Sequence, residues 1–515
     1  MLIHDLLRRT ARDHPDRTAL LLTTGGDSRT YAELLERTHR LANAIGDLAE
    51  PGDRVAILSD NSIPYVEAYY GVPAAGAALT TLNTRLHPKE WAWILENAEA
   101  SVLLVQEQYL PAIREHLAGL KALRHVVVIG EPVDDLPAYE DLLAAASPEP
   151  STRVVSADDV AWVMYTSGTT GFPKGAQLSH RNLVTSILQS VLEYEPSRET
   201  RFLNAMPLCH VAGYLTPVNL FRGGTVLMMP GWEPEAWMQV VQEHRITSGG
   251  FAPTMMAILL AHPRIDDYDL SSLEWMGYGA SKIPAELLRR TLDRFGPIVY
   301  AGMGMTELAG NILTLDREAH RRAAAGEENL LDAVGRPMQL VDLRIVDAAG
   351  NDCPVGEIGE IWVRGDQVTV GYLGNPEATA ASFTGDWFHT GDLARRDEEG
   401  FLSIVDRAKD MIISGGENVY SAEVENVLHE LPDVAEAAVI GLPHEVWGEQ
   451  VVAVLVRRPG AEVTDDEVIA RVGDRLAAYK RPKQVVFLDE LPRTATGKVR
   501  KHDLRTALGA EVTAR

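Results

Sequence analysis

The run "YTSGTTGFPKGAQLSH", residues 165–180, follows the apolar stretch "VAWVMY" at 160–165 and leads into "SHRNLVTSILQ" at 179–189. The apolar stretch predicts a strand, and the second stretch predicts a helix. Between them, glycines permit close approach of the backbone, hydroxyls can donate hydrogen bonds, and Lys174 adds a positive charge. The run therefore predicts a phosphate-binding loop, although its composition alone is also typical of a polar surface turn.

The loop does not have the spacing of a Walker A motif. That motif requires Gly-Lys followed by Ser or Thr, whose hydroxyl meets Mg²⁺. In this chain Lys174 is preceded by Pro173 and followed by Gly175. The order of residues argues against ordinary P-loop kinase or ATPase chemistry and favours a different kind of phosphate cradle.

Length and composition indicate a globular protein of more than one domain. A chain of 515 residues exceeds the size at which a single hydrophobic core usually stops growing. Its hydrophobic fraction of 46% and charged fraction of 23% are those of a soluble protein. No segment approaches the roughly 18 uninterrupted apolar residues of a membrane span, so no integral membrane segment is predicted.

The N-terminal sequence and the net charge indicate where the protein is located and which ligands it is not expected to bind. "MLIHDLLRRTARDHPDRTALLL" lacks the pattern of a secretory signal and predicts an amphipathic helix, so we expect a cytoplasmic protein. A net charge of −25 argues against a nucleic-acid binder, because phosphate contacts need an excess of Lys and Arg. Cys209 and Cys353 have no CxxC spacing, which supports neither a disulfide framework nor a cysteine-based zinc site.

Three regions differ in their pattern of strands and helices. From about residue 52 to 310, short apolar runs alternate with longer amphipathic stretches, which predicts α/β layers with largely parallel sheets. Residues 340–406 read as short strands separated by Gly and Asp, typical of a smaller β-rich subdomain. Beyond residue 410, strands and helices alternate compactly. We place a boundary near "DRAKD", giving an N-terminal domain of residues 1–408 and a C-terminal domain of residues 409–515.

The loop sequence "YTSGTTGFPKG" resembles the phosphate-loop signature of the adenylate-forming (ANL) superfamily. This superfamily includes acyl-CoA synthetases, luciferases and nonribosomal adenylation domains. Later motifs of the superfamily follow in their usual order: "GMGMTE" at 302–307, "WFHTGD" at 387–392, "DRAKDMIISGGENVYSAEVE" at 406–425 and "PRTATGKVRK" at 492–501. The resemblance thus spans essentially the whole chain. It implies a large N-terminal domain of layered α/β sheets with a β-rich subdomain, plus a small mobile α+β C-terminal domain that carries a catalytic lysine.

The resemblance also implies a reaction. Members of the superfamily use ATP to convert a carboxylate into an acyl-adenylate and pyrophosphate, and then pass the acyl group to a nucleophile, commonly the thiol of CoA. We therefore expect an AMP-forming acid:CoA ligase that uses ATP, Mg²⁺, CoA and a small carboxylic acid. The alternatives are transfer to a carrier protein, an amine or another nucleophile, and a nucleotide-binding regulator on an inactive scaffold. The resemblance is also compatible with a homodimer.

Most residues implied by the resemblance belong to the nucleotide site. Lys174 and the loop would hold the β- and γ-phosphates, and Thr306 would contact the α-phosphate. Glu307 would help to hold Mg²⁺, a hard cation that prefers oxygen ligands. Asp392 would accept hydrogen bonds from the ribose, and Arg407 would support the nucleotide, although each alone could be a loop salt bridge. The implied ATP- and AMP-binding residues are Thr166, Ser167, Gly168, Thr169, Thr170, Gly171, Lys174, Gly302, Met303, Gly304, Asp392 and Arg407.

Two lysines and a Gly-rich segment would divide the two half-reactions. Lys498, in "TATGKVRK", corresponds to the lysine that enters the site for adenylation, where it would stabilise the charge that moves in the transition state. Lys409 falls at the hinge position. Rotation there would withdraw Lys498 and bring "SGGENVY" to the CoA side. The implied catalytic residues are Lys498, His210, Thr306 and Glu307, and the implied CoA-side residues are Ser414, Gly415 and Gly416.

The acid-binding residues are apolar for the most part. The implied acyl pocket consists of Val211, Ala212, Tyr214, Phe251, Gly279 and Ala280. His210, in "PLCHVAG", would border the acyl-adenylate, with a buried structural histidine as the alternative. Met303 replaces the aromatic residue that stacks on adenine in most relatives. No Asp or Glu occurs from 202 to 232, where amino-acid-activating relatives place a carboxylate. Because a buried unpaired ammonium is costly, a fatty or aryl acid is favoured over an amino acid.

Overall fold

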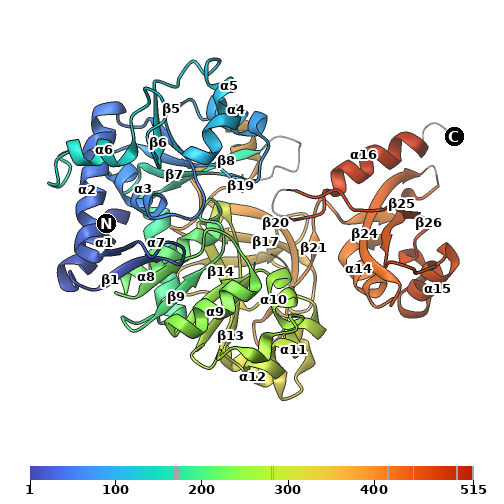
Figure 1. Ribbon diagram of the computed structural model, residues 1–515. Helices are drawn as coiled ribbons and strands as arrows, with labels where there is room; N and C mark the ends of the chain where they lie inside the picture. The colour runs from blue at the N-terminus through green and yellow to red at the C-terminus, as the bar shows by residue number, and fades with distance from the viewer. Residues whose placement is uncertain are drawn as a thin grey trace. The chain divides into compact units, whose positions relative to one another are not determined.

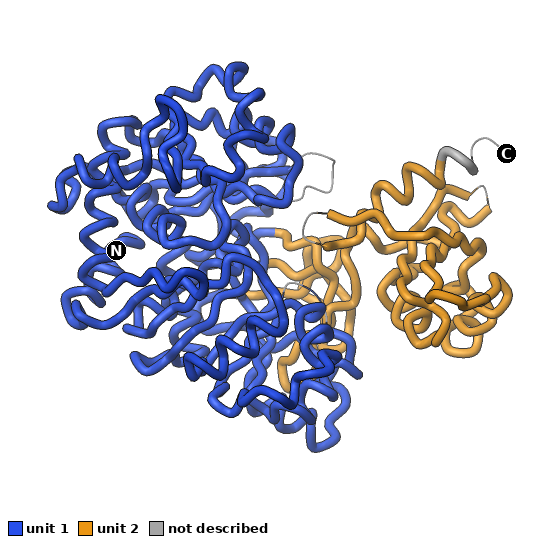
Figure 2. Tube along the Cα trace, in the orientation of Figure 1, with its two compact units in different colours: residues 1–342, 363–388 blue, residues 343–362, 389–515 orange. Residues whose placement is uncertain are grey.

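The computed structural model describes residues 1–166, 173–279, 281, 283–414, 417–444, 446–494 and 497–512. The chain divides into two compact units, which Figure 2 colours separately. Unit 1 consists of Met1–Asp342 and Val363–Phe388, and unit 2 consists of Leu343–Trp362 and His389–Arg515. The predicted boundary between residues 408 and 409 lies inside unit 2, where the β-rich segment and the C-terminal segment are grouped together, and it stays a prediction.

One sheet of unit 1 carries the phosphate loop. It has seven strands in the order β18-β8-β7-β4-β3-β5-β6. The pairs from β7 to β6 are parallel, and β8 and β18 are added antiparallel at one edge. The strands are β3 (Arg54–Leu58), β4 (Ala78–Thr81), β5 (Ala100–Gln106), β6 (His125–Ile129), β7 (Val160–Thr166), β8 (Lys174–Ser179) and β18 (Gly371–Tyr372).

The second sheet of unit 1 has nine strands in the order β15-β14-β13-β12-β11-β9-β10-β1-β2. All pairs from β13 to β1 are parallel, which confirms the predicted α/β layers with largely parallel sheets. The strands are β1 (Thr18–Leu22), β2 (Ser28–Thr30), β9 (Arg201–Asn204), β10 (Thr225–Met228), β11 (Ser248–Phe251), β12 (Trp275–Gly279), β13 (Val299–Met305), β14 (Gly310–Leu315) and β15 (Arg336–Pro337).

Helices cover these sheets in the layered arrangement seen in Figure 1. The predicted N-terminal amphipathic helix is confirmed as α1, which buries Ile3, Leu6 and Leu7 on one face. The helices of unit 1 are α1 (Ile3–Asp13), α2 (Tyr31–Leu48), α3 (Ile63–Ala74), α4 (Pro88–Asn97), α5 (Leu110–Leu117), α6 (Tyr139–Ala145), α7 (His180–Tyr194), α8 (Leu215–Phe221), α9 (Pro234–His244), α10 (Pro253–Leu260), α11 (Ala285–Phe295), α12 (Arg317–Ala324) and α13 (Pro376–Ala381).

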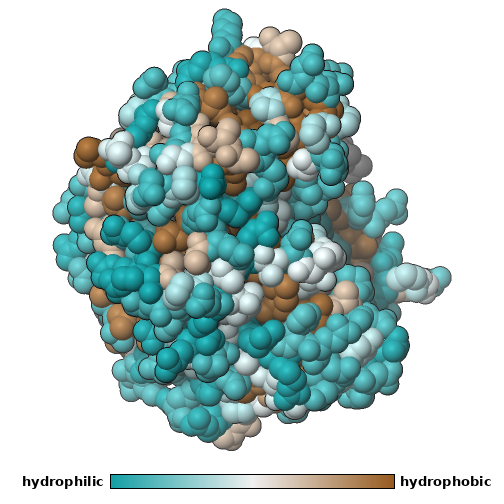
Figure 3. Space-filling model, turned by 60° about the vertical axis from the view of Figure 1, so that its left-hand side comes forward, coloured by the Kyte–Doolittle hydropathy of each residue, from teal (hydrophilic) through white to brown (hydrophobic). Residues whose placement is uncertain are grey.

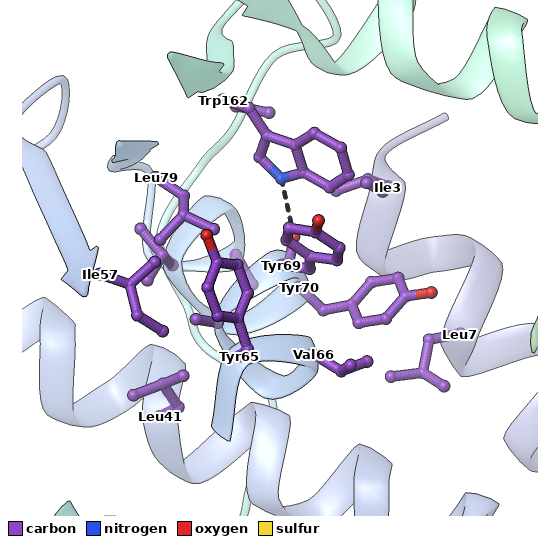
Figure 4. Close-up of a cluster of buried hydrophobic side chains, with 14 of the residues drawn as sticks. Ile3, Leu7, Leu41, Ile57, Tyr65, Val66, Tyr69, Tyr70, Leu79 and Trp162 are labelled. Atoms are coloured by element: carbon purple, nitrogen blue, oxygen red, sulfur yellow. Dashed lines mark hydrogen bonds between the residues drawn. The ribbon is translucent and has the colours of Figure 1, made fainter. Parts of the chain in front are cut away.

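The main core of unit 1 is built around α3, whose residues are buried on every side. A helix that is apolar all round belongs in the interior of a large protein. Tyr69 of this helix stacks on Trp162 of β7 with 4.3 Å between ring centroids, and the indole Nε1 donates to the Tyr69 carbonyl at 3.2 Å (Figure 4). Tyr65, Tyr70 and Ile3 complete the cluster. The face drawn in Figure 3, by contrast, is mostly hydrophilic.

A buried ion pair joins α2 to α3. The Glu67 side chain is fully buried and pairs with Arg37, while the Tyr139 hydroxyl donates to Glu67 at 2.8 Å. Because Arg37→Ala leaves the Glu67 charge buried and unpaired, we expect a loss of about 3–5 kcal/mol in the free energy of unfolding. Chemical unfolding of the wild type and the variant measures this difference in the free energy of unfolding. Arg114→Ala, which breaks the exposed pair with Asp134, should cost about 0–1 kcal/mol, and equal losses in the two variants would contradict the prediction.

Acid sensitivity is expected at the contact between α1 and α7. The buried His180 ring accepts a hydrogen bond from the Ile3 backbone N–H at 3.2 Å, and its centroid lies 5.8 Å from that of His4. Burial lowers the pKa of His180 to about 3. An unfolded histidine titrates near pH 6.5, so between that pH and about 3 the unfolded chain binds more protons, and stability falls as the pH falls.

The expected size of the His180 effect is about 1.4 kcal/mol of unfolding free energy lost between pH 7.5 and pH 5.5. His180→Asn keeps an acceptor for the Ile3 N–H but does not titrate. Chemical unfolding of the wild type and this variant at both pH values gives the difference directly. An identical pH dependence in the two proteins would show that His180 is not the group responsible.

Unit 2 contains a β-rich part and a C-terminal α+β part. The first is formed mainly from β16 (Asp342–Val346), β17 (Gly359–Arg364), β20 (Trp387–Arg396) and β21 (Leu402–Arg407). The short β19 (Phe383–Thr384), which pairs with the start of β20, belongs to unit 1. The C-terminal sheet has the order β23-β22-β25-β24, with β26 beside β25. Its elements are β22 (Ile412–Ser414), β23 (Glu417–Val419), β24 (Val434–His444), β25 (Gly448–Arg457), β26 (Gln484–Phe487), α14 (Ser421–His429), α15 (Asp465–Arg475) and α16 (Lys501–Val512).

The C-terminal sheet is buried on both faces because apolar residues occupy successive positions of β25. Val451, Ala453 and Leu455 join one hydrophobic cluster, which also includes residues of α14 and α15. Val452 and Val454 join a second cluster with residues of α16. Successive side chains of a strand point to opposite faces, so this run places apolar groups on both. The predicted α+β C-terminal domain with its compact alternation of strand and helix is confirmed.

Candidate active site

The phosphate loop closes a β-hairpin rather than joining a strand to a helix. β7 and β8 pair antiparallel, and their last register pair brings Thr166 opposite Lys174. Ala176 and Leu178 alternate with more polar residues, which explains why this segment forms a strand. Helix α7 begins only at His180, with Ser179 as its N-cap. The helix predicted from residue 179 is confirmed, but β8 separates its N-terminus from the loop.

Of the predicted loop residues, the structure describes Thr166 and Lys174. The Thr166 hydroxyl donates to the Lys174 carbonyl at 3.4 Å, which holds the two ends of the loop together. The other predicted phosphate-binding residues, Ser167, Gly168, Thr169, Thr170 and Gly171, lie outside the described residues.

Lys174, Glu307 and Tyr372 form one cluster in unit 1. Glu307 is 5% exposed, and its Oε1 accepts a hydrogen bond from the Tyr372 hydroxyl at 2.9 Å. Lys174 Nζ lies 5.1 Å from the centroid of the Tyr372 ring, within the range of a cation–π contact. Burial, and then the Glu307 charge, raise the pKa of Tyr372, so its hydroxyl stays a donor. Tyr372 therefore links two of the predicted site residues.

Sequence reasoning missed Tyr372. It lies in β18, a strand of two residues that pairs with β8 through Gly371↔Gln177 and Tyr372↔Ala176. Gly371 has φ +133°, and a Cβ there would approach Thr379 Cγ2 to 2.7 Å, so the backbone requires glycine. The only sequence signal was an aromatic residue beside a glycine, which is too common to indicate a site.

The carboxyl ends of β11, β12 and β13 meet at one edge of the nine-stranded sheet. In parallel sheets this edge is where ligands bind. Gly279 is in register with Gly302, and a Cβ on Gly279 would lie 2.6 Å from the Gly302 carbonyl oxygen. A Cβ on Gly304 would lie 2.0 Å from the carbonyl oxygen of Gly310, so both positions require glycine. The predicted residues Phe251, Gly279, Gly302, Met303, Gly304, Thr306 and Glu307 are brought together here, whereas Ala280 lies outside the described residues.

The segment around His210 has a half-buried part and a fully buried part. His210 precedes the 3₁₀ turn Val211–Tyr214, and its Nε2 lies 3.4 Å from Asn83 Nδ2. His210, Val211 and Ala212 are half-buried. Tyr214 lies in the core, where the Ser190 hydroxyl donates to its phenol at 3.3 Å.

The neighbouring Cys209 is a neutral, packed group. Burial raises the pKa of its thiol to about 12, so the thiolate is not formed at neutral pH. Cys209 and Cys353 are both free. Cys209 therefore acts here as a small apolar side chain.

In unit 2, two predicted nucleotide-binding residues pair with each other. β20 and β21 place Asp392 opposite Arg407, and Arg407 Nε lies 2.7 Å from Asp392 Oδ1. Arg407 also donates to the carbonyl of Thr390 at 3.2 Å, while the Asp392 side chain is only 6% exposed. The ion pair holds the carboxylate in a fixed orientation, an arrangement that the two separate motifs did not indicate.

The predicted hinge and the catalytic lysine also lie in unit 2. Burial lowers the pKa of Lys409. Asp406 precedes Lys409 in the chain and Ser421 follows it. The buried Asp406 carboxylate accepts a hydrogen bond from the Ser421 hydroxyl at 2.9 Å. Lys498 is exposed, and its carbonyl accepts a hydrogen bond from the Thr494 N–H at 2.8 Å. Ser414 is buried at the end of β22, and Gly415 and Gly416 lie outside the described residues.

Residues 7–373 match the family model described as "AMP-binding enzyme". The chain belongs to this AMP-binding enzyme family. Residues 423–498 match a second model, "AMP-binding enzyme C-terminal domain". The first match includes the phosphate loop and the motif at 302–307, and the second includes Lys498.

Similar proteins of this family are ligases. A feruloyl-CoA synthase of Amycolatopsis sp is 42% identical over 97% of this chain and 98% of that protein. A long-chain-fatty-acid–CoA ligase of Thermus thermophilus is 36% identical over 94% of this chain and 91% of that protein. The crystal structure of ATP-bound MatB from Rhodopseudomonas palustris superposes with a TM-score of 0.88, at 32% identity and 99% coverage of both chains.

These matches confirm the predicted adenylate-forming family, its CoA-ligase branch and its fold. As an AMP-binding enzyme, the protein is an AMP-forming acid:CoA ligase that uses ATP, a carboxylic acid and CoA. In the part of the chain that the structure describes, no helix combines the length and apolar character needed to cross a membrane.

Proposed function

We propose that this ligase activates an aryl-substituted acid at the carboxyl ends of β11, β12 and β13. The observation that carries the adenylation step of this proposal is the Lys174–Tyr372–Glu307 cluster, which places a cation and a buried carboxylate beside β13, the strand bearing Gly302 and Gly304. The half-buried segment His210–Ala212 offers no charge to pair with an amino group. The similar feruloyl-CoA synthase is named for an aromatic acid.

In the adenylation step, the chain's own groups would stabilise the leaving pyrophosphate. Lys174, held at the loop base beside Thr166, would face the β- and γ-phosphates. Thr306 follows β13 directly and would donate to the α-phosphate. Such preorganised donors lower the barrier because they need no rearrangement as charge develops.

The donor set at Glu307 fits Mg²⁺. One carboxylate oxygen accepts from Tyr372, which leaves Oε2 for a hard cation beside the phosphates. When bound, Mg²⁺ would neutralise charge on the phosphate oxygens. Tyr372 would keep the Glu307 carboxylate in one orientation, and Lys174, which lies over the tyrosine ring, would help to balance the carboxylate's charge.

Unit 2 would contribute residues that bind the ribose of the nucleotide and residues that switch the enzyme between its two half-reactions. Asp392, oriented by Arg407, would accept from the ribose hydroxyls. Lys498 would enter for adenylation, and rotation at Lys409 would then present the segment at Ser414 to CoA. Because Asp406 and Ser421 lie on opposite sides of Lys409 and are hydrogen-bonded, their contact would have to break in that rotation.

Acid-dependent exchange of pyrophosphate into ATP tests the substrate class. The assay is run on a panel of fatty, aryl and arylalkanoic acids, with AMP release and loss of CoA thiol followed in parallel. Exchange strongest with ring-bearing acids supports the proposal, and exchange strongest with long unbranched acids contradicts it. The homodimer and the cytoplasmic location stay predictions, which light scattering and cell fractionation can measure.

A further inference from the structure

Helix α7 carries a stripe of polar side chains on a buried face. Asn182, Ser186, Gln189 and Ser190 are each at most 4% exposed. Residues spaced three and four positions apart lie on one side of a helix, so these side chains share a face. A buried polar side chain costs free energy unless it is hydrogen-bonded, and the partners of the stripe therefore indicate what it does.

Two side chains from distant segments, one of them in this stripe, hold consecutive carbonyls of the turn that follows Glu307. Gln367 Nε2 donates to the carbonyl of Leu308 at 2.9 Å. The Ser186 hydroxyl donates to the carbonyl of Ala309 at 2.9 Å. Gln367 and Ser186 are at most 1% exposed, so water does not compete for these bonds. The turn is therefore held by donors that lie 59 and 123 residues away in the chain.

The Gln367 amide is itself fixed at both of its polar atoms. Its Nε2 also donates to the carbonyl of Asn311 at 3.1 Å, and its Oε1 accepts from Gln189 Nε2 at 2.6 Å. The Gln189 oxygen in turn accepts from the Leu340 N–H at 2.7 Å. A buried polar network whose members are all hydrogen-bonded is rigid. Helix α7 and strand β14 therefore set the orientation of the amide that holds the turn.

The backbone of the turn needs this support at Ala309. This residue is fully buried and has φ +54°, a left-handed conformation that is unfavourable for a residue with a Cβ. Such a conformation persists only where the surrounding structure fixes it. Thr306 and Glu307 lie in the same turn, and the Glu307 carbonyl accepts from the Thr369 N–H at 2.7 Å. A shift at Ala309 would therefore displace Thr306 and Glu307.

We propose that Gln367 and Ser186 are positioning residues for adenylation, which hold the turn so that Thr306 and Glu307 face the nucleotide phosphates. The inference rests on the proposed roles of Thr306 and Glu307 in binding the α-phosphate and Mg²⁺, and it does not depend on the class of acid. Gln367 and Ser186 would act through the backbone and contact no substrate. A displacement of about 1 Å can cost about 100-fold in rate, so bonds remote from the phosphates can control the reaction.

Ser186→Ala and Gln367→Met test the proposal, because each removes a donor without enlarging the side chain appreciably. The measured quantities are the Mg²⁺ concentration for half-maximal pyrophosphate exchange and the KM for ATP, with the acid that the wild type uses best. Ser186→Ala should raise both by about threefold to tenfold, and Gln367→Met, which loses more bonds, by about tenfold or more. Neither quantity depends on the folded fraction of the preparation, so a loss of stability alone leaves both unchanged.

The control is Tyr31→Phe, which removes a buried hydroxyl in the main core of unit 1. This hydroxyl is hydrogen-bonded to the carbonyls of Leu220 at 3.0 Å and Gly224 at 2.6 Å. The variant should lose stability but keep the wild-type Mg²⁺ requirement and KM for ATP. A rise as large as that in the two test variants would overturn the inference, because the loss of any buried bond would then produce the effect.

Comparison with Glu307→Gln separates failure of this inference from failure of the proposed function. If Glu307→Gln raises the Mg²⁺ requirement but Ser186→Ala and Gln367→Met do not, the positioning role is overturned and the role of Glu307 stands. If Glu307→Gln leaves the Mg²⁺ requirement unchanged, the proposed role of Glu307 is overturned and the inference with it.

Discussion

Replacing Lys498 with alanine should lower acid-dependent pyrophosphate exchange by about 100-fold or more, while thioester formation from a supplied acyl-adenylate and CoA continues. The lysine is proposed to stabilise the charge that passes from carboxylate to pyrophosphate, a need that ends once the adenylate has formed. Its side chain is exposed and its backbone carbonyl is bonded to the Thr494 N–H, so truncation should leave the fold unchanged.

The contrast between the two half-reactions is the decisive measurement for Lys498. Arg500→Ala serves as the control, because this residue is exposed in the same basic segment and pairs only with its helix neighbour Asp503 among the described residues. It should retain exchange activity close to that of the wild type. An equal loss of both half-reactions in Lys498→Ala would refute the assigned role.

Glu307→Gln should reduce exchange by about 100- to 1,000-fold, because it removes the charge proposed to hold Mg²⁺ and keeps the side chain's shape. The amide oxygen can still accept from the Tyr372 hydroxyl. Tyr372→Phe removes only that hydrogen bond, which orients the carboxylate, and should cost about tenfold. A larger loss in Glu307→Gln than in Tyr372→Phe would distinguish the binding of Mg²⁺ by the carboxylate from the orientation of that carboxylate by Tyr372.

Titration with Mg²⁺ provides an independent measurement for the same pair. The Mg²⁺ concentration that gives half-maximal exchange should rise strongly in Glu307→Gln and only slightly in Tyr372→Phe. Both substitutions are nearly isosteric, so the buried site keeps its packing. An unchanged Mg²⁺ requirement in Glu307→Gln would assign the carboxylate a structural role and contradict the proposed one.

The sequence was most informative where a signal is carried by residues close together in the chain. The apolar run at 160–165 predicted β7, and the pattern from residue 179 predicted α7. The ordered motifs identified the family and its reaction. The segment 174–179 was read only as the end of a loop, and its pairing as β8 depends on β7 and β18 on either side of it.

Contacts between distant segments were decided only by the tertiary structure. Tyr372 joins Lys174 and Glu307 because a two-residue strand docks on the edge of β8, and no local pattern specifies that pairing. The pairing of Asp392 with Arg407 follows in the same way from the register of β20 and β21.

The sequence by itself determined the family and the reaction, and it predicted an apolar acid pocket. Only the tertiary structure placed Ser248 beside Trp275, and among the described residues it gives neither of their side-chain donors an acceptor. Periodicity and motif spacing report on neighbours along the chain, whereas the register between strands and the hydrogen bonds of a buried group depend on how the whole chain packs.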